Sequence, residues 1–121
     1  MRILRIDHVQ LAMPPKSEER ARAFYVGVLE LREVPKPPEL AKRGGAWFEA
    51  GTVKVHLGVE EEFRPAKKAH PALVVEGLNE IVAKCEKAGH KTKPDAPFDG
   101  YNRVHVEDPF GNRIELMERA D

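Results

Sequence analysis

The order of apolar segments repeats within this chain, and the repeat constrains the fold more than any other feature of the sequence. A strand pattern, an amphipathic helix pattern and three further strands occur twice, with starts near residues 6 and 68. Each copy takes about half of the 121 residues, so an internal duplication fills the chain. The sequence therefore predicts an α+β fold of two βαβββ modules that form a cup-shaped mixed sheet. The whole chain, 1–121, is expected to be one domain, with modules over about 3–59 and 70–119 and a connector over 60–69.

Apolar spacing predicts the elements of the first module. A strand is expected over Ile3–Met13, ended by Pro14 and Pro15, because proline donates no ladder hydrogen bond. A helix follows, since four apolar residues recur at the i, i+3, i+4, i+7 spacing: Ala21, Phe24, Tyr25 and Val28. Further strands are expected over 31–34, 46–49 and 52–59.

The second module repeats this pattern. A strand is expected over Pro71–Val75, and a helix carries the same apolar spacing at Leu78, Ile81, Val82 and Cys85. Gly89 stands where a helix C-cap glycine belongs. Prolines and a glycine predict a loop over Pro94–Asn102, followed by a hairpin of strands 103–107 and 113–118.

Charge and cysteine content exclude several classes of protein. Lys and Arg number 20 and Asp and Glu number 20, so the chain has no net charge with which to bind a nucleic-acid backbone or an anionic membrane surface. Cys85 is the single cysteine, which rules out an intrachain disulfide. The longest run without a charged residue, His8–Pro15, is far shorter than the roughly 20 residues of a membrane span. A cytoplasmic protein is expected.

Strand alternation places three histidines and one glutamate on the face that the helices leave open. Val9, Val55 and Leu116 are typical of the packed face, so their strand neighbours point the other way. The open-face residues are His8, His56, His70 and Glu115, and the spacing is 48 residues within the first pair and 45 within the second. Two modules whose open faces curve together would gather the four side chains. Their donor atoms suit one divalent metal per cup, namely Zn, Ni, Co, Mn or Fe(II).

Three stretches resemble the vicinal oxygen chelate superfamily, which includes glyoxalase I, bleomycin-resistance proteins and extradiol dioxygenases. They are Ile6–Ala12, Ala23–Tyr25 and Asp108–Leu116, and the resemblance covers essentially the whole chain. It implies a paired-module cup around a divalent metal, with His8, His70 and Glu115 as ligands. His56 falls where members place a glutamate, a glutamine, a histidine or a residue that does not bind metal.

Further side chains are expected to face the cup. Trp47 and Glu49 do so in the first module, and Arg103 and His105 in the second. Arg103 is expected either to bind an anionic group of a substrate or to hold Glu115 in place. His105 is expected either to transfer a proton or to make a structural hydrogen bond. The expected loop carries two aromatic residues that could cover the cup, Phe98 and Tyr101.

The number of ligands separates the candidate reactions. Four protein ligands, His56 included, leave two adjacent positions on an octahedral metal, which suits a bidentate enediolate-type intermediate formed from a small oxygenated substrate. Glu115, Glu49 or His105 would then move the proton, as in a glyoxalase-like lyase or isomerase. Glyoxalases place a second glutamate where His56 stands, so their paired-carboxylate mechanism does not carry over intact. Three ligands favour an extradiol dioxygenase, and a small-molecule binding protein of the bleomycin-resistance type is the other alternative. A homodimer is expected.

Overall fold

The structure, a computed structural model, describes all 121 residues and divides into two compact units. Unit 1 comprises Met1–Phe63 and unit 2 comprises Arg64–Asp121. The division falls inside the segment 60–69, which the sequence predicts to connect the modules. Each unit is described by itself.

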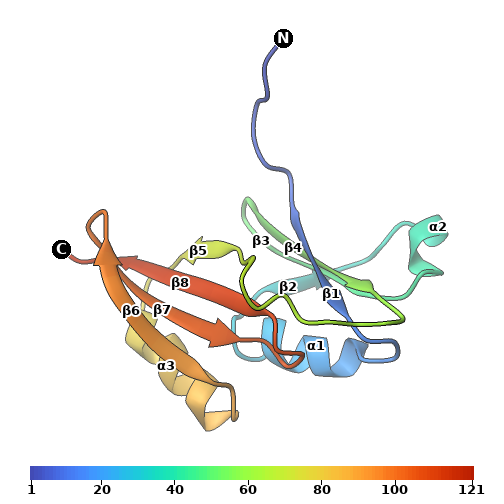
Figure 1. Cartoon of the computed structure of the whole chain (residues 1–121). Coiled ribbons are helices and arrows are strands. Elements are labelled where there is room, and N and C mark those ends of the chain that lie inside the picture. Colours follow the sequence, from blue (N-terminus) through green and yellow to red (C-terminus); the bar gives the residue numbers. More distant parts are fainter. The chain divides into compact units, whose positions relative to one another are not determined.

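Unit 1 contains one mixed sheet. Its elements are β1 (Val9–Met13), α1 (Glu18–Tyr25), β2 (Arg32–Val34), α2 (Pro38–Ala41), β3 (Ala46–Ala50) and β4 (Val53–Val59). The strand order is β1-β4-β3-β2, with β1 parallel to β4 and the other neighbours antiparallel (Figure 1). The expected helix residues Ala21, Phe24, Tyr25 and Val28 are all buried. Tyr25 stacks on Phe48 of β3, so one face of the sheet and the helix form the core of unit 1.

Unit 2 repeats this arrangement. Its elements are β5 (Ala72–Val74), α3 (Leu78–Lys87), β6 (Thr92–Phe98), β7 (Tyr101–Glu107) and β8 (Arg113–Arg119), in the sheet order β5-β8-β7-β6. β5 is parallel to β8, and the other neighbours are antiparallel. Val106, Ile114 and Leu116 are buried on the face that α3 contacts. The two mixed four-stranded sheets confirm the predicted α+β fold class.

Helix α3 ends where the sequence predicts. The amide of His90 donates to the carbonyl of Cys85, and the amide of Gly89 donates to that of Glu86. This pair of bonds is the Schellman motif, and Gly89 takes its required left-handed conformation with φ of 86°. At the other end, the carboxylate of Glu118 accepts hydrogen bonds from the amides of Gly77 and Leu78, so a residue of β8 caps the helix.

The expected first strand is too long. Only Val9–Met13 is a strand, and residues 1–8 have no regular structure. Ile3, Leu4 and Ile6 are 93%, 77% and 79% exposed, because the partner strand β4 pairs with the chain only from Val9 onward. An apolar pattern shows that a segment suits a strand, but a strand needs a neighbour that supplies hydrogen bonds.

The expected loop over 94–102 is wrong. Thr92–Phe98 is strand β6, and it forms a hairpin with β7 around Asp99 and Gly100. Both turn residues have positive φ, 51° and 80°, which is the type I′ geometry that an Asp-Gly pair favours. Pro94 and Pro97 are tolerated because β6 is the edge strand and its outer side needs no donors.

One short helix was not expected. In α2, Pro38 occupies the first turn, where the missing amide costs no hydrogen bond. No helix in the chain has both the length and the apolar composition needed to cross a bilayer.

Candidate functional site

The turn between β7 and β8 fixes the strand that carries Glu115. Asp108 and Asn112 are 3% and 0% exposed. One oxygen of Asp108 accepts from the amides of Phe110 and Asn112, and the other accepts from the side-chain amide of Asn112, all at 2.9 Å. The side-chain oxygen of Asn112 accepts from the amide of Ala66 at 2.9 Å. The turn therefore ties β8 to the segment that leads to His70.

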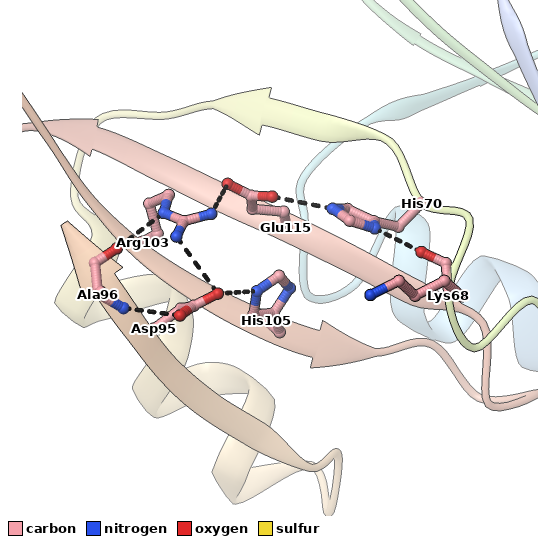
Figure 2. A network of polar contacts seen from close by, with 7 residues as sticks. All are labelled: Lys68, His70, Asp95, Ala96, Arg103, His105 and Glu115. Atoms are coloured by element: carbon pink, nitrogen blue, oxygen red, sulfur yellow. Dashed lines mark hydrogen bonds and ion pairs between the residues drawn. The ribbon is translucent and has the colours of Figure 1, made fainter. Parts of the chain in front are cut away.

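His70 and Glu115 lie in contact on the open face of unit 2. Nε2 of His70 is 2.9 Å from Oε1 of Glu115, and Nδ1 of the same ring is 2.8 Å from the carbonyl oxygen of Lys68 (Figure 2). A carbonyl only accepts, so Nδ1 carries the proton of a neutral ring and Nε2 presents a lone pair. That lone pair faces a carboxylate oxygen, and the pair is satisfied when a proton or a metal cation lies between them.

Arg103 holds the other side of the Glu115 carboxylate. Its Nη1 donates to Oε2 of Glu115 at 3.1 Å, its Nε donates to the carbonyl of Ala96 at 2.9 Å, and its Nη2 lies 3.3 Å from Asp95. Of the two roles that the sequence left open for Arg103, the structure displays the contact with Glu115. One carboxylate oxygen is thus fixed by Arg103, while the other faces His70.

His105 is oriented by Asp95. Nε2 of His105 donates to Oδ2 of Asp95 at 2.8 Å, so Nδ1 carries the lone pair of the neutral ring. Nδ1 is buried and has no hydrogen-bond partner. Figure 2 shows the His105 ring, from β7, on the same side of the sheet as His70 and Glu115. The His70 and His105 ring centroids are 5.4 Å apart, in an edge-to-face arrangement.

Both carboxyl groups of this network favour the ionised form. Burial raises the pKa of Glu115, but the contacts with His70 and Arg103 and the charge of Arg103 outweigh it and leave that pKa below its usual value. The pKa of Asp95 is lowered chiefly by its hydrogen bond from His105. Glu115 is therefore available as an anionic ligand, and Asp95 as a hydrogen-bond acceptor.

The donor atoms of unit 2 fit a divalent metal in chemistry and partly in spacing. His70, His105 and Glu115 each offer an atom within 4.8 Å of the others. Two bonds of about 2.1 Å at a right angle place their donors about 3.0 Å apart, and the 2.9 Å between His70 and Glu115 agrees with this separation. A ring nitrogen and an ionised carboxylate are usual metal ligands, and a histidine ligand usually donates its other ring N–H to a group such as the Lys68 carbonyl.

Unit 1 brings His8 and His56 together in a stack of three rings. The His8 and His56 rings are 4.1 Å apart with 17° between planes, and Trp47 lies 4.2 Å from the other face of His56 at 7°. The register explains the second contact, because Trp47 and His56 are direct cross-strand partners. Burial, then the nearby charge of His8, lowers the pKa of His56, so its ring stays neutral at neutral pH. Metal ligation uses the ring edge, so joint ligation by this pair requires at least one ring to turn.

A pocket of about 360 Å³ adjoins this stack. Glu49 and Lys54, which are register partners in the β3–β4 hairpin, both line it. The other lining residues are Asp7, His8, Gln10, Leu40, Trp47 and His56. Glu49 and Trp47 thus lie on the same face as His56, as alternation predicts.

Phe98 and Tyr101 lie in strands rather than in a loop. They are register partners at the end of the β6–β7 hairpin. The guanidinium of Arg103 lies 5.4 Å from the centre of the Phe98 ring, and that of Arg119 lies 5.2 Å from the centre of the Tyr101 ring. Both aromatic residues therefore contact cations, and Phe98 remains 59% exposed.

Asp95 is the site residue that sequence reasoning missed. Asp95 falls within the expected loop over 94–102, and the alternation of side chains between two faces applies only to strands. The Asp-Gly pair at 99–100 was the available signal, since it predicts a hairpin and places a β6 residue beside His105.

Comparison with known proteins gives a family for this fold and site. A family model described as the Glyoxalase/Bleomycin resistance protein/Dioxygenase superfamily matches residues 5–116. The chain belongs to this superfamily, the vicinal oxygen chelate proteins, and the resemblance seen in the sequence is confirmed.

Solved structures share the fold over nearly the whole chain. A glyoxalase family protein from Bacillus anthracis is 48% identical with a TM-score of 0.91, and the match covers 98% of both chains. The fosfomycin resistance protein FosX from Mesorhizobium loti is 18% identical with a TM-score of 0.73, covering 97% of this chain and 93% of that one. Virulence protein STM3117 from Salmonella typhimurium is 22% identical with a TM-score of 0.70, covering 98% and 99%. The latter two show the fold alone. No curated protein matches the sequence.

Proposed function

We propose that this protein is a metal-dependent lyase or isomerase of the glyoxalase type that acts on a small oxygenated substrate. The observation that carries the proposal is the network of unit 2, in which His70 and Glu115 face each other at ligand spacing and His105 presents an unpartnered nitrogen beside them. Superfamily membership supports it.

His70 and Glu115 are the residues proposed to hold the metal in unit 2. The carbonyl of Lys68 orients the His70 ring, and Arg103 fixes one Glu115 oxygen so that the other is directed at His70. His8 and His56 are the ligands proposed for unit 1, on the strength of the contact between their rings and the neutral state of His56. A bound divalent metal supplies a Lewis acid for substrate oxygens.

His105 is proposed to move the proton. The proton on a carbon next to a carbonyl passes to Nδ1, because Asp95 already occupies Nε2 and stabilises the imidazolium that results. The same nitrogen returns the proton to the neighbouring carbon of the substrate. Glu49, which lines the unit 1 pocket, is the second group proposed for this task.

The test is proton exchange at carbon. Protein without a histidine tag is stripped of metal, reloaded with Ni²⁺, Mn²⁺ or Zn²⁺, and incubated in heavy water with small α-hydroxycarbonyl compounds such as hydroxyacetone and lactaldehyde. Proton NMR should show metal-dependent deuterium incorporation next to the carbonyl. A His105→Gln variant should slow incorporation by about 100-fold or more while still binding metal.

Two results would replace the proposal. If no metal binds but an aromatic or drug-like molecule does, the protein is a binding protein of the bleomycin-resistance type. If metal binds without carbon exchange and the Fe²⁺ form consumes oxygen with catechols, it is an extradiol-type dioxygenase. We further propose that the protein is a cytoplasmic homodimer.

A further inference from the structure

A small pocket beside His105 is lined by two cationic side chains. Its volume is about 140 Å³, and its lining residues are Lys93, Pro94, Asp95, His105 and Arg113. At roughly 30 Å³ per water molecule, this volume holds four or five waters. Four of the five lining residues carry ionisable side chains, so the pocket suits a small charged group such as a carboxylate, phosphonate or phosphate.

Strand register places the pocket on the open face of unit 2. Lys93 of β6 pairs with His105 of β7, which pairs with Glu115 of β8, so the three residues form one cross-strand row. Arg113 lies two residues before Glu115 on the same strand and therefore on the same face. His105 is thus common to the pocket and to the candidate metal centre.

The charges of this pocket are unevenly paired. Asp95 contacts Arg103, which also pairs with Glu115, and accepts a hydrogen bond from His105, so its contacts lie with these two residues. No ion pair engages Lys93 or Arg113, although Glu107 is the register partner of Arg113. Two cations without carboxylate partners at one small pocket leave a site that an anion would complete.

We propose that Lys93 and Arg113 form a subsite for the anionic group of the molecule on which the neighbouring centre acts. The proposal rests on the function proposed above and narrows its substrate to a small organic acid, with a carboxylate, phosphonate or phosphate. The Arg113 guanidinium binds two oxygens of such a group, and the Lys93 ammonium supplies a second charge. A group bound there lies against His105, so the rest of the substrate is directed toward His70 and Glu115.

The experiment measures anion binding to metal-free protein. Methylphosphonate is titrated by calorimetry into the wild type and into Lys93→Gln, Arg113→Gln, Arg113→Lys and Lys87→Gln. Lys87 ends α3, on the other face of the sheet, and serves as the matched control. Lys93→Gln and Arg113→Gln should each weaken binding by about 10-fold or more, because each removes a charged hydrogen-bond partner. Arg113→Lys should retain part of the affinity, and Lys87→Gln all of it.

The same samples are titrated with Ni²⁺, so that failure of the anion subsite can be distinguished from failure of the metal-dependent function. Equal methylphosphonate affinity in all five proteins, or none in the wild type, overturns the subsite, whatever the metal result. Loss of anion binding in Lys93→Gln and Arg113→Gln but not in Lys87→Gln, in protein that binds no metal, supports the subsite and overturns the metal-dependent function. The neutral dimethyl ester of methylphosphonate should not bind, and equal binding of the ester and the acid also overturns the subsite.

Discussion

Nε2 of His70 lies 2.9 Å from Oε1 of Glu115, and neither atom can satisfy the other without a proton or a cation between them. The arrangement predicts that metal binding depends on this pair. Replacing Glu115 with Gln should lower affinity for Ni²⁺ by at least about 10-fold, because a neutral amide is a weaker ligand than a carboxylate.

The measurement is calorimetric titration of the metal-free protein. Glu107→Gln is the matched control, since Glu107 lies on the adjacent strand and is not part of the cluster. Equal Ni²⁺ affinity in wild type and Glu115→Gln would remove Glu115 from the proposed ligands.

His56 decides between the candidate reactions. Replacing it with Ala should weaken metal binding by about 10-fold or more if it is a ligand, whereas a histidine that only packs would leave the affinity unchanged. Trp47 is the single tryptophan and stacks on His56, so its fluorescence reports directly on this ring during a metal titration. Unaltered affinity, together with oxygen consumption by the Fe²⁺ form with catechols, would favour the dioxygenase.

Asp95 is expected to act through His105 as a positioning residue. Asp95→Asn replaces the acceptor that holds Nε2 of His105, and should slow deuterium incorporation by about 10-fold or more. Affinity for Ni²⁺ should stay within about 2-fold of the wild type, and Asp99→Asn, in the Asp-Gly turn where asparagine is equally accepted, should change neither quantity. A loss of Ni²⁺ affinity that matches the loss of rate would instead make the effect structural.

Asn112 is expected to stabilise unit 2. Asn112→Ala removes the acceptor of the Ala66 amide and the side-chain hydrogen bond to Asp108 in a buried turn, which should lower the free energy of unfolding by about 2–4 kcal/mol. Urea denaturation measures this change. Asn79→Ala, at an exposed position of α3, is the control and should cost less than about 1 kcal/mol. Equal midpoints for both variants would show that the turn network contributes little.

The exposed apolar residues before β1 predict self-association. Ile3, Leu4 and Ile6 are more than three-quarters exposed, and burying them against a second copy would remove apolar surface from water. Sedimentation velocity at micromolar concentration should give a dimer, and replacing all three residues with Ser should shift it toward the monomer. Val26→Ser, at another exposed apolar residue, should not. A single 13.6 kDa species for the wild type would exclude the homodimer.

The repeat and the spacing of apolar residues were enough to predict the fold class and most elements. The apolar residues predicted for α1 and α3 are buried or half-buried, because a 3.6-residue period leaves one helix face to pack on a sheet. Alternation also placed His56 on the same face as Trp47 and Glu49, and Glu115 on the same face as Arg103 and His105. Successive side chains of a strand point to opposite faces of the sheet, so the face of each residue follows once the strand is known.

Strand limits and partners were decided by tertiary structure. Residues 3–8 have a strand-like pattern but no partner, whereas β6 contains two prolines and is nevertheless a strand, because its outer edge requires no hydrogen bonds. Because the sequence predicts a loop over 94–102, it does not predict that Asp95 belongs to the site. Its distance from His105 depends on the register of the β6–β7 hairpin, including the shift after Asp95, and local sequence patterns do not specify that shift.

The sequence by itself thus determined which residue types share a face, and the tertiary structure decided which of their atoms meet. The pairing of His70 with Glu115 required β5 to lie parallel to β8, which the Asp108–Asn112 turn fixes through Ala66. The unpartnered nitrogen of His105 required Asp95 to occupy the other one. Such contacts join residues 10 to 46 positions apart, and their geometry follows from packing and hydrogen bonding of the whole unit rather than from any single segment.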